Sequence, residues 1–203
     1  IGDPITREAL KTREDSVTVA EISSFQLETA VSFHPKVSAI LNITPDHLNR
    51  HHTMENYVAV KESIAKNQTK EDACVLNYRD PHTRAFGERC PARVVWFSVG
   101  ERPQEGYFLD GETICSCFEG KTQRLMNIHE MQLLGMHNVE NVMAAIAMAD
   151  AFGVPMENIL NTVKQFQAVE HRIEYVATKR GVMYYNDSKG TNPDAAIRAI
   201  RAM

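Results

Sequence analysis

The chain has 203 residues, enough to bury a substantial core in one large domain or two small ones. Its formal net charge of -4 and pI near 6.1 argue against a nucleic-acid-binding surface. No apolar run approaches the length of a membrane span, and the first residues lack the basic and apolar regions of a signal peptide, so we expect no membrane association.

The cysteines and the chain ends add two expectations. The four cysteines lack metal-type CxxC spacing, which indicates reduced thiols in a cytoplasmic protein. They are Cys74, Cys90, Cys115 and Cys117, and the last two would share one face of a strand. The first residue is not Met, and the chain stops inside a helical pattern, so we expect a fragment of a longer protein.

Residues 17–22 (VTVAEI) predict a strand with Glu21 near its carboxyl end, followed by a short helix. A carboxylate in that position either reaches water at an edge or belongs to a site. The pattern alone slightly favours the first.

The stretch 37–61 predicts a strand, a break and a helix. The apolar run from Val37 to Ile43 is typical of a strand covered on both faces, and Thr44-Pro45 ends it. His47 follows the carboxyl end of that strand, where ligands collect in open α/β sheets.

The helix that begins after Thr53 places Lys61 within its apolar stripe. The stripe consists of Met54, Tyr57, Val58, Ile64 and Ala65. Lys61 either extends along its stem to water or is desolvated. A desolvated lysine has a lowered pKa, and its neutral amine can take up carbon dioxide as a carbamate, an anionic ligand for a hard metal.

Further along, short apolar runs at residues 73–77 and 94–98, with a helix near residues 80–88 between them, predict a parallel sheet with covering helices. From Tyr107 onward, turns at Asp110-Gly111 and Glu119-Gly120 predict a small antiparallel meander. The predicted fold class is α/β, with a mostly parallel sheet flanked by helices.

Two helices and a hairpin complete the chain. A helix after Gly135 ends at Gly153, and Pro155 opens another, with Ile159, Leu160, Val163 and Phe166 inside. Residues 167–171 resemble a joint between domains 1–170 and 171–203. A hairpin turns at residues 179–181, and Asn192 and Pro193 predict a helix start.

Four strings, in order, resemble the Mur ligases, ATP-dependent enzymes of peptidoglycan precursor synthesis. They are EISSFQLE, LNITPDHL, GMHNVENVMAA with HRIE, and NDSKGTNPDA. The resemblance implies that residues 1–170 are a P-loop NTPase-like central ATPase domain and that residues 171–203 begin a Rossmann-like ligase domain. No G-x-x-x-x-G-K-[ST] phosphate loop occurs. In the family this loop lies upstream, so we expect it before Ile1 and expect the fragment alone to be inactive.

The resemblance also implies roles for individual residues. Two Mg²⁺ ions would be held by Glu21, His47 and Lys61 as a carbamate, with Lys61 and His47 as the catalytic residues. Without the resemblance, Asn138 and Asn141 read as a cap and a surface residue. The remaining implied contacts are adenine at Asn138 and Asn141, ATP at Arg172 and Asp187, D-glutamate at Lys189 and Thr191, and the muramoyl product near Ser23.

The last string is typical of the branch that adds D-glutamate to UDP-N-acetylmuramoyl-L-alanine. The implied reaction is ATP-driven amide formation through an acyl phosphate, catalysed by a monomer that acts on small molecules. Asn49 and Gly190 differ from the residues common in the family, and neither removes a proposed ligand.

Three alternatives stay open. Another Mur-type or folylpolyglutamate-type ligase is the nearest, although NDSKGTN speaks against the latter. A carbamate-dependent metal hydrolase would need histidines at several strand ends, which the adjacent His51 and His52 do not supply. A non-catalytic nucleotide-binding module would have no need of a lysine in an apolar stripe.

Overall fold

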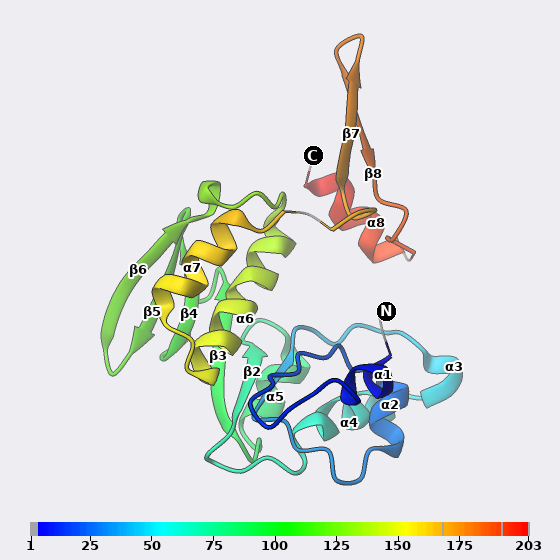
Figure 1. Cartoon of the computed structure of the whole chain (residues 1–203), viewed down its shortest axis with the longest axis vertical. Helices are drawn as coiled ribbons and strands as arrows, with labels where there is room; N and C mark the ends of the chain where they lie inside the picture. The colour runs from blue at the N-terminus through cyan, green and yellow to red at the C-terminus, as the bar shows by residue number, and fades with distance from the viewer. Residues whose placement is uncertain (1–3, 168, 192, 203) are drawn as a thin grey trace.

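The computed structural model describes residues 4–167, 169–191 and 193–202, and it contains one mixed sheet of six strands (Figure 1). The sheet order is β1-β2-β3-β4-β5-β6, and its first four strands are parallel. Strands β5 and β6 continue antiparallel as the predicted meander. The strands are β1 (Val37–Ile40), β2 (Ala73–Asn77), β3 (Arg93–Val99), β4 (Gly106–Asp110), β5 (Thr113–Phe118) and β6 (Lys121–Asn127). The predicted α/β class, mostly parallel sheet and meander are confirmed.

Helices lie on both faces of this sheet, and a separate hairpin follows it. The α-helices are α1 (Ile5–Ala9), α2 (Ser24–Thr29), α3 (Leu48–His51), α4 (Met54–Glu62), α5 (Pro81–Gly87), α6 (Met136–Phe152), α7 (Met156–Gln165) and α8 (Pro193–Arg201). Short 3₁₀ turns are η1 (Ser63–Ala65) and η2 (Ile128–Glu130). The hairpin of β7 (Glu174–Lys179) and β8 (Val182–Asn186) forms its own two-stranded sheet and projects away from the main body (Figure 1).

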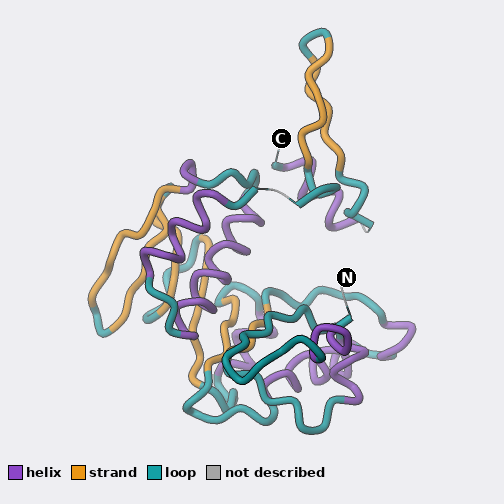
Figure 2. Tube along the Cα trace, viewed as in Figure 1, coloured by secondary structure: helices purple, strands orange, loops and turns teal. Residues whose placement is uncertain are grey.

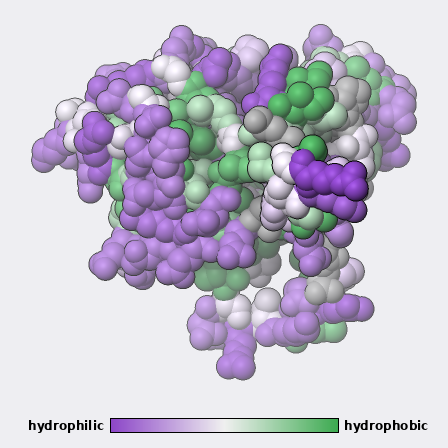
Figure 3. All heavy atoms as spheres, turned by 90° about the horizontal axis from the view of Figure 1, so that it is seen from above, coloured by the Kyte–Doolittle hydropathy of each residue, from purple (hydrophilic) through white to green (hydrophobic). Residues whose placement is uncertain are grey.

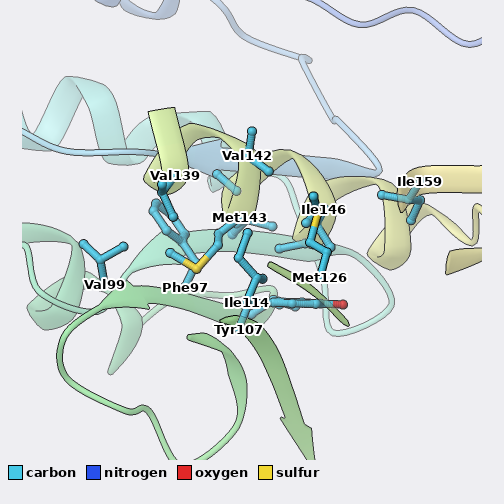
Figure 4. Packing of buried hydrophobic residues seen from close by; sticks show 14 of the residues in the cluster. Phe97, Val99, Tyr107, Ile114, Met126, Val139, Val142, Met143, Ile146 and Ile159 are labelled. Atoms are coloured by element: carbon cyan, nitrogen blue, oxygen red, sulfur yellow. The ribbon is translucent and has the colours of Figure 1, made fainter. Parts of the chain in front are cut away.

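The larger core lies between the sheet and helices α6 and α7. In Figure 4 the α6 side chains Val139, Met143 and Ile146 point toward the side chains of the sheet. Phe97, Tyr107 and Ile114 are the largest of those sheet residues, and each is fully buried. Alternate residues of β2 face the other side, where Leu76 packs with Tyr57 of α4 and Phe86 of α5. Because both faces are covered, the parallel strands are apolar throughout.

A glycine allows β4 to return beside β3 without a helical crossover. Gly106 has a φ of +129°, and a Cβ at this position would lie 2.2 Å from the carbonyl oxygen of Trp96. Only glycine accepts both the backbone conformation and this close approach. The connection therefore brings Tyr107 directly opposite Phe97 in register.

The loop that follows β1 is held by side chains from the end of β2. Asn77 donates from Nδ2 to the carbonyl oxygen of Leu41 over 3.0 Å, and the Ile43 amide donates to Asp80 Oδ2 over 2.9 Å. The other oxygen of Asp80 caps α5 by accepting from the amides of His82 and Thr83. These bonds fix the backbone that leads to His47.

Two predictions about local structure are wrong. Residues 17–22 are not a strand: they form a loop (Figure 2), in which Val17 is 61% and Val19 is 88% exposed. Apolar alternation shows what a strand would bury, but a strand also needs a neighbour that accepts its backbone hydrogen bonds. The second wrong prediction placed Phe166 inside the helix that Pro155 opens. Helix α7 ends at Gln165, and the extended backbone at Phe166 turns its ring out of the apolar stripe, so that it is 50% exposed.

Other expected features are present. Thr53 caps α4 through a hydrogen bond from the Asn56 amide, and the last hairpin turns as predicted. Asn192, the expected cap of α8, lies outside the described residues. Among the described residues, no helix combines the length and apolar character that crossing a bilayer requires. The face shown in Figure 3 is largely hydrophilic.

A buried carboxylate joins the segment before β1 to the segment before β2. The Asp72 side chain is 5% exposed and lies 2.7 Å from His34 Nε2 and 3.3 Å from Lys36 Nζ. It also accepts from the Thr69 amide over 2.8 Å. The hydrogen bond with His34, followed by the one from Thr69, holds the pKa of Asp72 well below its usual range.

We expect Asp72→Asn to destabilise the protein in a pH-dependent way. Because the folded-state pKa is lowered, the stabilising contribution is fully present above the unfolded pKa of about 3.9 and is lost as the pH falls through the folded pKa. Urea unfolding at several pH values should therefore show a difference from wild type at pH 7 that shrinks in acid. The exposed neighbour Glu71, changed to Gln, is the control. A difference that does not vary with pH would contradict the assignment.

Candidate functional site

A cavity of about 360 Å³ lies at the carboxyl ends of the first parallel strands. The loop after β1, the helix α4 and the first turn of α6 form most of its wall, and residues 172 and 195 contribute from the far end of the chain. The lining residues are Leu41, Asn42, Thr44, Asp46, Tyr57, Lys61, Phe97, His137, Glu140, Asn141, Arg172 and Ala195.

Lys61 is half-buried in this cavity, and its Nζ lies 5.2 Å from the centroid of the Tyr57 ring. Burial lowers the pKa of the Lys61 amine, and the charges of Asp46 and Glu21 oppose that shift. Both carboxylates are thus near enough to act on the amine. Of the two interpretations of Lys61, this geometry favours the desolvated lysine.

Asp46 and His47 lie in the loop between β1 and α3, and of the two only Asp46 is in the described lining of the cavity that holds Lys61. Asp46 lines the cavity, and the His47 ring lies 4.9 Å from Phe25, with its Nδ1 3.5 Å from Asp46 Oδ1. His47 adopts a φ of +52°, which turns the chain sharply into α3. Sequence reasoning did not single out Asp46, although it precedes His47 in the same string.

The structure brings Glu21 near Lys61, but not as the end of a strand. Glu21 is exposed in the loop before α2, so its predicted place near the carboxyl end of a strand is wrong. Within the described residues, no group of three or more His, Cys, Asp or Glu side chains is arranged to hold a metal ion. A metal site here would therefore depend on the lysine, and the ligand set Glu21, His47 and Lys61 stays a prediction.

The first turn of α6 presents polar groups to the opposite wall. Asn141 lines the cavity and donates from Nδ2 to Asn138 Oδ1 over 3.3 Å, and Asn138 donates to the Leu134 carbonyl oxygen over 2.8 Å. The two asparagines thus face each other, as their spacing predicts. His137 and Glu140, which sequence reasoning missed, line the same wall.

Of the seven predicted substrate and nucleotide contacts, only Asn141 and Arg172 are in the described lining of the cavity. The other five, which are absent from it, are Ser23, Asn138, Asp187, Lys189 and Thr191. Ser23 caps α2 through the Gln26 amide, and Asp187 accepts from the Ile173 amide over 3.1 Å. The Lys189 amide donates to the His171 carbonyl oxygen. Thr191 is exposed. Their roles, like those of the asparagines and Arg172, stay predictions.

Comparison with known proteins gives the family of this chain. The Mur ligase middle domain matches residues 1–149, more than half of the chain. The chain belongs to the Mur ligase family. It is 62% identical over its full length to the UDP-N-acetylmuramoylalanine--D-glutamate ligase of Lachnospira eligens and 57% identical to that of Lachnoclostridium phytofermentans. It spans about 45% of the length of each of these relatives.

Solved Mur ligases share the fold at low sequence identity. MurF from Acinetobacter baumannii matches 81% of the chain with a TM-score of 0.64 at 22% identity, over 36% of its own length. The UDP-N-acetylmuramate-alanine ligase MurC from Thermotoga maritima matches 88% with a TM-score of 0.63 at 22% identity, over 39% of its length. MurF from Thermotoga maritima, solved with ADP, matches 83% with a TM-score of 0.60 at 20% identity, over 39% of its length.

We predict that the Lys61 amine of the full-length protein titrates below the value of about 10.4 for a lysine in an unstructured peptide, because burial disfavours its charged form. The measurement is the rate of acetylation of Lys61 against pH, by mass spectrometry in buffer free of carbon dioxide. Asp46→Asn should lower the midpoint further, because it removes a charge that raises this pKa. The urea-unfolded protein is the control, and equal midpoints in the folded and unfolded protein would refute desolvation.

Proposed function

We propose that the protein to which this chain belongs is an ATP-dependent ligase that adds D-glutamate to UDP-N-acetylmuramoyl-L-alanine. The observation that carries the proposal is the 62% identity along the whole chain to a ligase named for that reaction. Low-identity relatives share only the fold, so they do not distinguish among the acceptor amino acids used by the family. The string NDSKGTN at residues 186–192 favours the D-glutamate branch.

In this proposal residues 1–170 belong to the central ATPase domain, and residues 171–203 begin the next domain. Support comes from the separate sheet of β7 and β8 and from the position of Arg172 on the cavity wall. A nucleotide in the cavity would then contact both parts. We further propose a cytoplasmic monomer whose partners are small-molecule substrates.

The residues around Lys61 suit magnesium if the lysine is a carbamate. The neutral Nζ attacks the carbon of carbon dioxide, a C–N bond forms, and one proton leaves to solvent. The product is an anion that adds a third negative charge where the charges of Glu21 and Asp46 already act on Lys61. Such a cluster needs cations to balance it, and oxygen ligands suit Mg²⁺. Glu21, His47 and carbamylated Lys61 would hold the two ions, which when bound neutralise phosphate charge.

The protein's own contribution to the reaction is orientation. The carboxylate of the muramoyl substrate takes the γ-phosphoryl group of ATP, and the amine of D-glutamate then displaces phosphate from the acyl phosphate. Asn138 and Asn141 would bind adenine, with Arg172 and Asp187 at the rest of the nucleotide. Lys189 and Thr191 would bind D-glutamate, and Ser23 would lie near the muramoyl product. Phosphoryl transfer is catalysed mainly by such positioning.

The function is tested by phosphate release from the full-length protein. We expect release to require ATP, Mg²⁺, UDP-N-acetylmuramoyl-L-alanine and D-glutamate together, with formation of the amide product by mass spectrometry. L-Glutamate, meso-diaminopimelate and L-alanine serve as matched acceptors that should not react. Turnover with one of these acceptors instead would place the protein in another branch. ATP binding without amide formation would support a nucleotide-binding module.

The carbamate is tested by two substitutions of Lys61 in the full-length protein. Lys61→Ala should cripple turnover while the fold persists, and a short carboxylate in solution should partly restore it by supplying an anionic oxygen ligand. Lys61→Arg should also fail, because a guanidinium is not carbamylated and stays positive. The control is Lys121→Ala, since Lys121 is exposed on β6 away from the cavity. Near-normal turnover of Lys61→Arg would exclude the carbamate.

A further inference from the structure

His51 is a buried histidine at the meeting point of α2, α3 and α4. Its side chain is 2% exposed, and both ring nitrogens have partners on α2. Nε2 lies 3.0 Å from Ser24 Oγ, and Nδ1 lies 3.3 Å from Glu28 Oε1. Ser24 and Glu28 are four residues apart and so present both groups from one face of the helix.

The partners define the hydrogen-bond directions around this ring. Glu28 Oε2 accepts from Arg50 Nη2 over 2.7 Å, and this contact lowers the pKa of Glu28. An ionised carboxylate only accepts hydrogen bonds, so Glu28 favours the ring tautomer with its proton on Nδ1, the nitrogen that lies 3.3 Å from Glu28 Oε1. In the neutral ring Nε2 is then an acceptor, and the hydroxyl of Ser24 donates to it.

Ring contacts extend from His51 to the neighbouring helices. Phe25 of α2 stacks on His51 with centroids 5.8 Å apart and an interplanar angle of 14°. Tyr57 of α4 lies 5.2 Å from the same ring, and Asn56 Nδ2 donates to the His51 carbonyl oxygen over 3.0 Å. Tyr57 in turn contacts Lys61, whose Nζ lies beside the Tyr57 ring.

The proposed magnesium ligands lie in these three helices or within a few residues of them. Glu21 stands three residues before Ser24, and Lys61 lies one turn after Tyr57. The carbonyl oxygen of His47 accepts from the His51 amide over 3.0 Å. No hydrogen-bonded ladder of the sheet holds these helices in place. The relative placement of the ligands therefore depends on contacts between the helices. His51, the last residue of α3, contacts α2 through Ser24 and Phe25 and α4 through Tyr57.

We propose that His51 is a positioning residue of the ligase, holding α2, α3 and α4 so that Glu21, His47 and Lys61 face one metal site. This inference rests on the proposed function for its ligand set. It goes beyond that set by naming a side chain that touches neither substrate nor metal. The hydrogen bond with Ser24 and the contact with Glu28 orient the ring, which also contacts Phe25 and Tyr57.

A rival interpretation of the same geometry is a nucleophilic serine. The His51 ring contacts Ser24 through one nitrogen and Glu28 through the other, as the histidine of a Ser–His–acid triad does. Ser24, however, is 3% exposed, so its hydroxyl is not accessible to a substrate. A fluorophosphonate probe, which labels activated serines, separates the two interpretations.

The test uses three variants of the full-length protein. His51→Phe keeps an aromatic ring near Phe25 and Tyr57 but removes the hydrogen bond with Ser24 and the contact with Glu28. His51→Asn places an amide nitrogen near the position of Nδ1 and can keep a polar contact with Glu28. Ser24→Ala removes a single partner and is the milder change if His51→Phe does not fold. The matched control is His34→Phe, which breaks a histidine–carboxylate contact of 2.7 Å elsewhere on the protein.

The main readout is the affinity for Mn²⁺, a substitute for Mg²⁺ with similar oxygen ligands, measured by electron paramagnetic resonance well below each variant's unfolding temperature. We expect His51→Phe to weaken Mn²⁺ binding about 10- to 100-fold, the range for residues that orient metal ligands. The kcat should fall in parallel while the KM for D-glutamate changes less than about twofold, because that subsite is not displaced. His51→Asn should recover part of the loss, and His34→Phe should lower only the unfolding temperature.

The outcomes separate this inference from the proposed function. Wild-type Mn²⁺ affinity and kcat in both His51→Phe and Ser24→Ala would overturn the positioning role while leaving the ligase intact. Absence of ligase turnover in the wild type would refute the proposed function, and the Mn²⁺ affinities would still test His51. Labelling of Ser24 by the fluorophosphonate would overturn the inference and assign a nucleophile.

Discussion

The packing of helices on both faces of the parallel strands is the constraint on which the site depends. Leu76 packs toward α4 and α5, and Val75 packs toward α6 on the opposite face. With both faces covered, a polar loop that leaves a strand has room only at the edge of the sheet. The bonds from Asn77 and Asp80 to the backbone after β1 hold that loop at the carboxyl edge, where the cavity forms.

The charges in the cavity follow from this placement. Lys61 comes from the apolar side of α4, so its amine loses solvent on the same face that packs against the sheet. Asp46 and Glu21 come from two separate loops and offset part of the cost of that burial. Desolvation favours the neutral amine, and the nearby carboxylates favour the protonated one. The chemistry proposed for the Mur ligase requires the neutral one.

Helices α2, α3 and α4 add a layer of organisation outside the sheet. Each is short, and a short helix has little stability of its own. The contacts of His51 with Ser24, Glu28 and Tyr57 join the three into one unit. Two parts of the structure would therefore position the proposed ligand residues. The sheet places the loop after β1, and the unit of α2, α3 and α4 orients the side chains.

Much of the fold and part of the site were predictable from sequence because the signals are local. Turn residues such as Asp110-Gly111, the Thr53 cap and the apolar run of β1 depend on neighbouring residues only. Lys61 was identified because its helical stripe is a local pattern. Tertiary structure alone decided what depends on partners: residues 17–22 lack a strand to pair with, and Asp46 joins Lys61 only because the loop is held at the sheet edge. The contacts of Ser24 and Glu28 with His51, over 20 residues away, have no local signature, since loop conformation and helix packing set that distance.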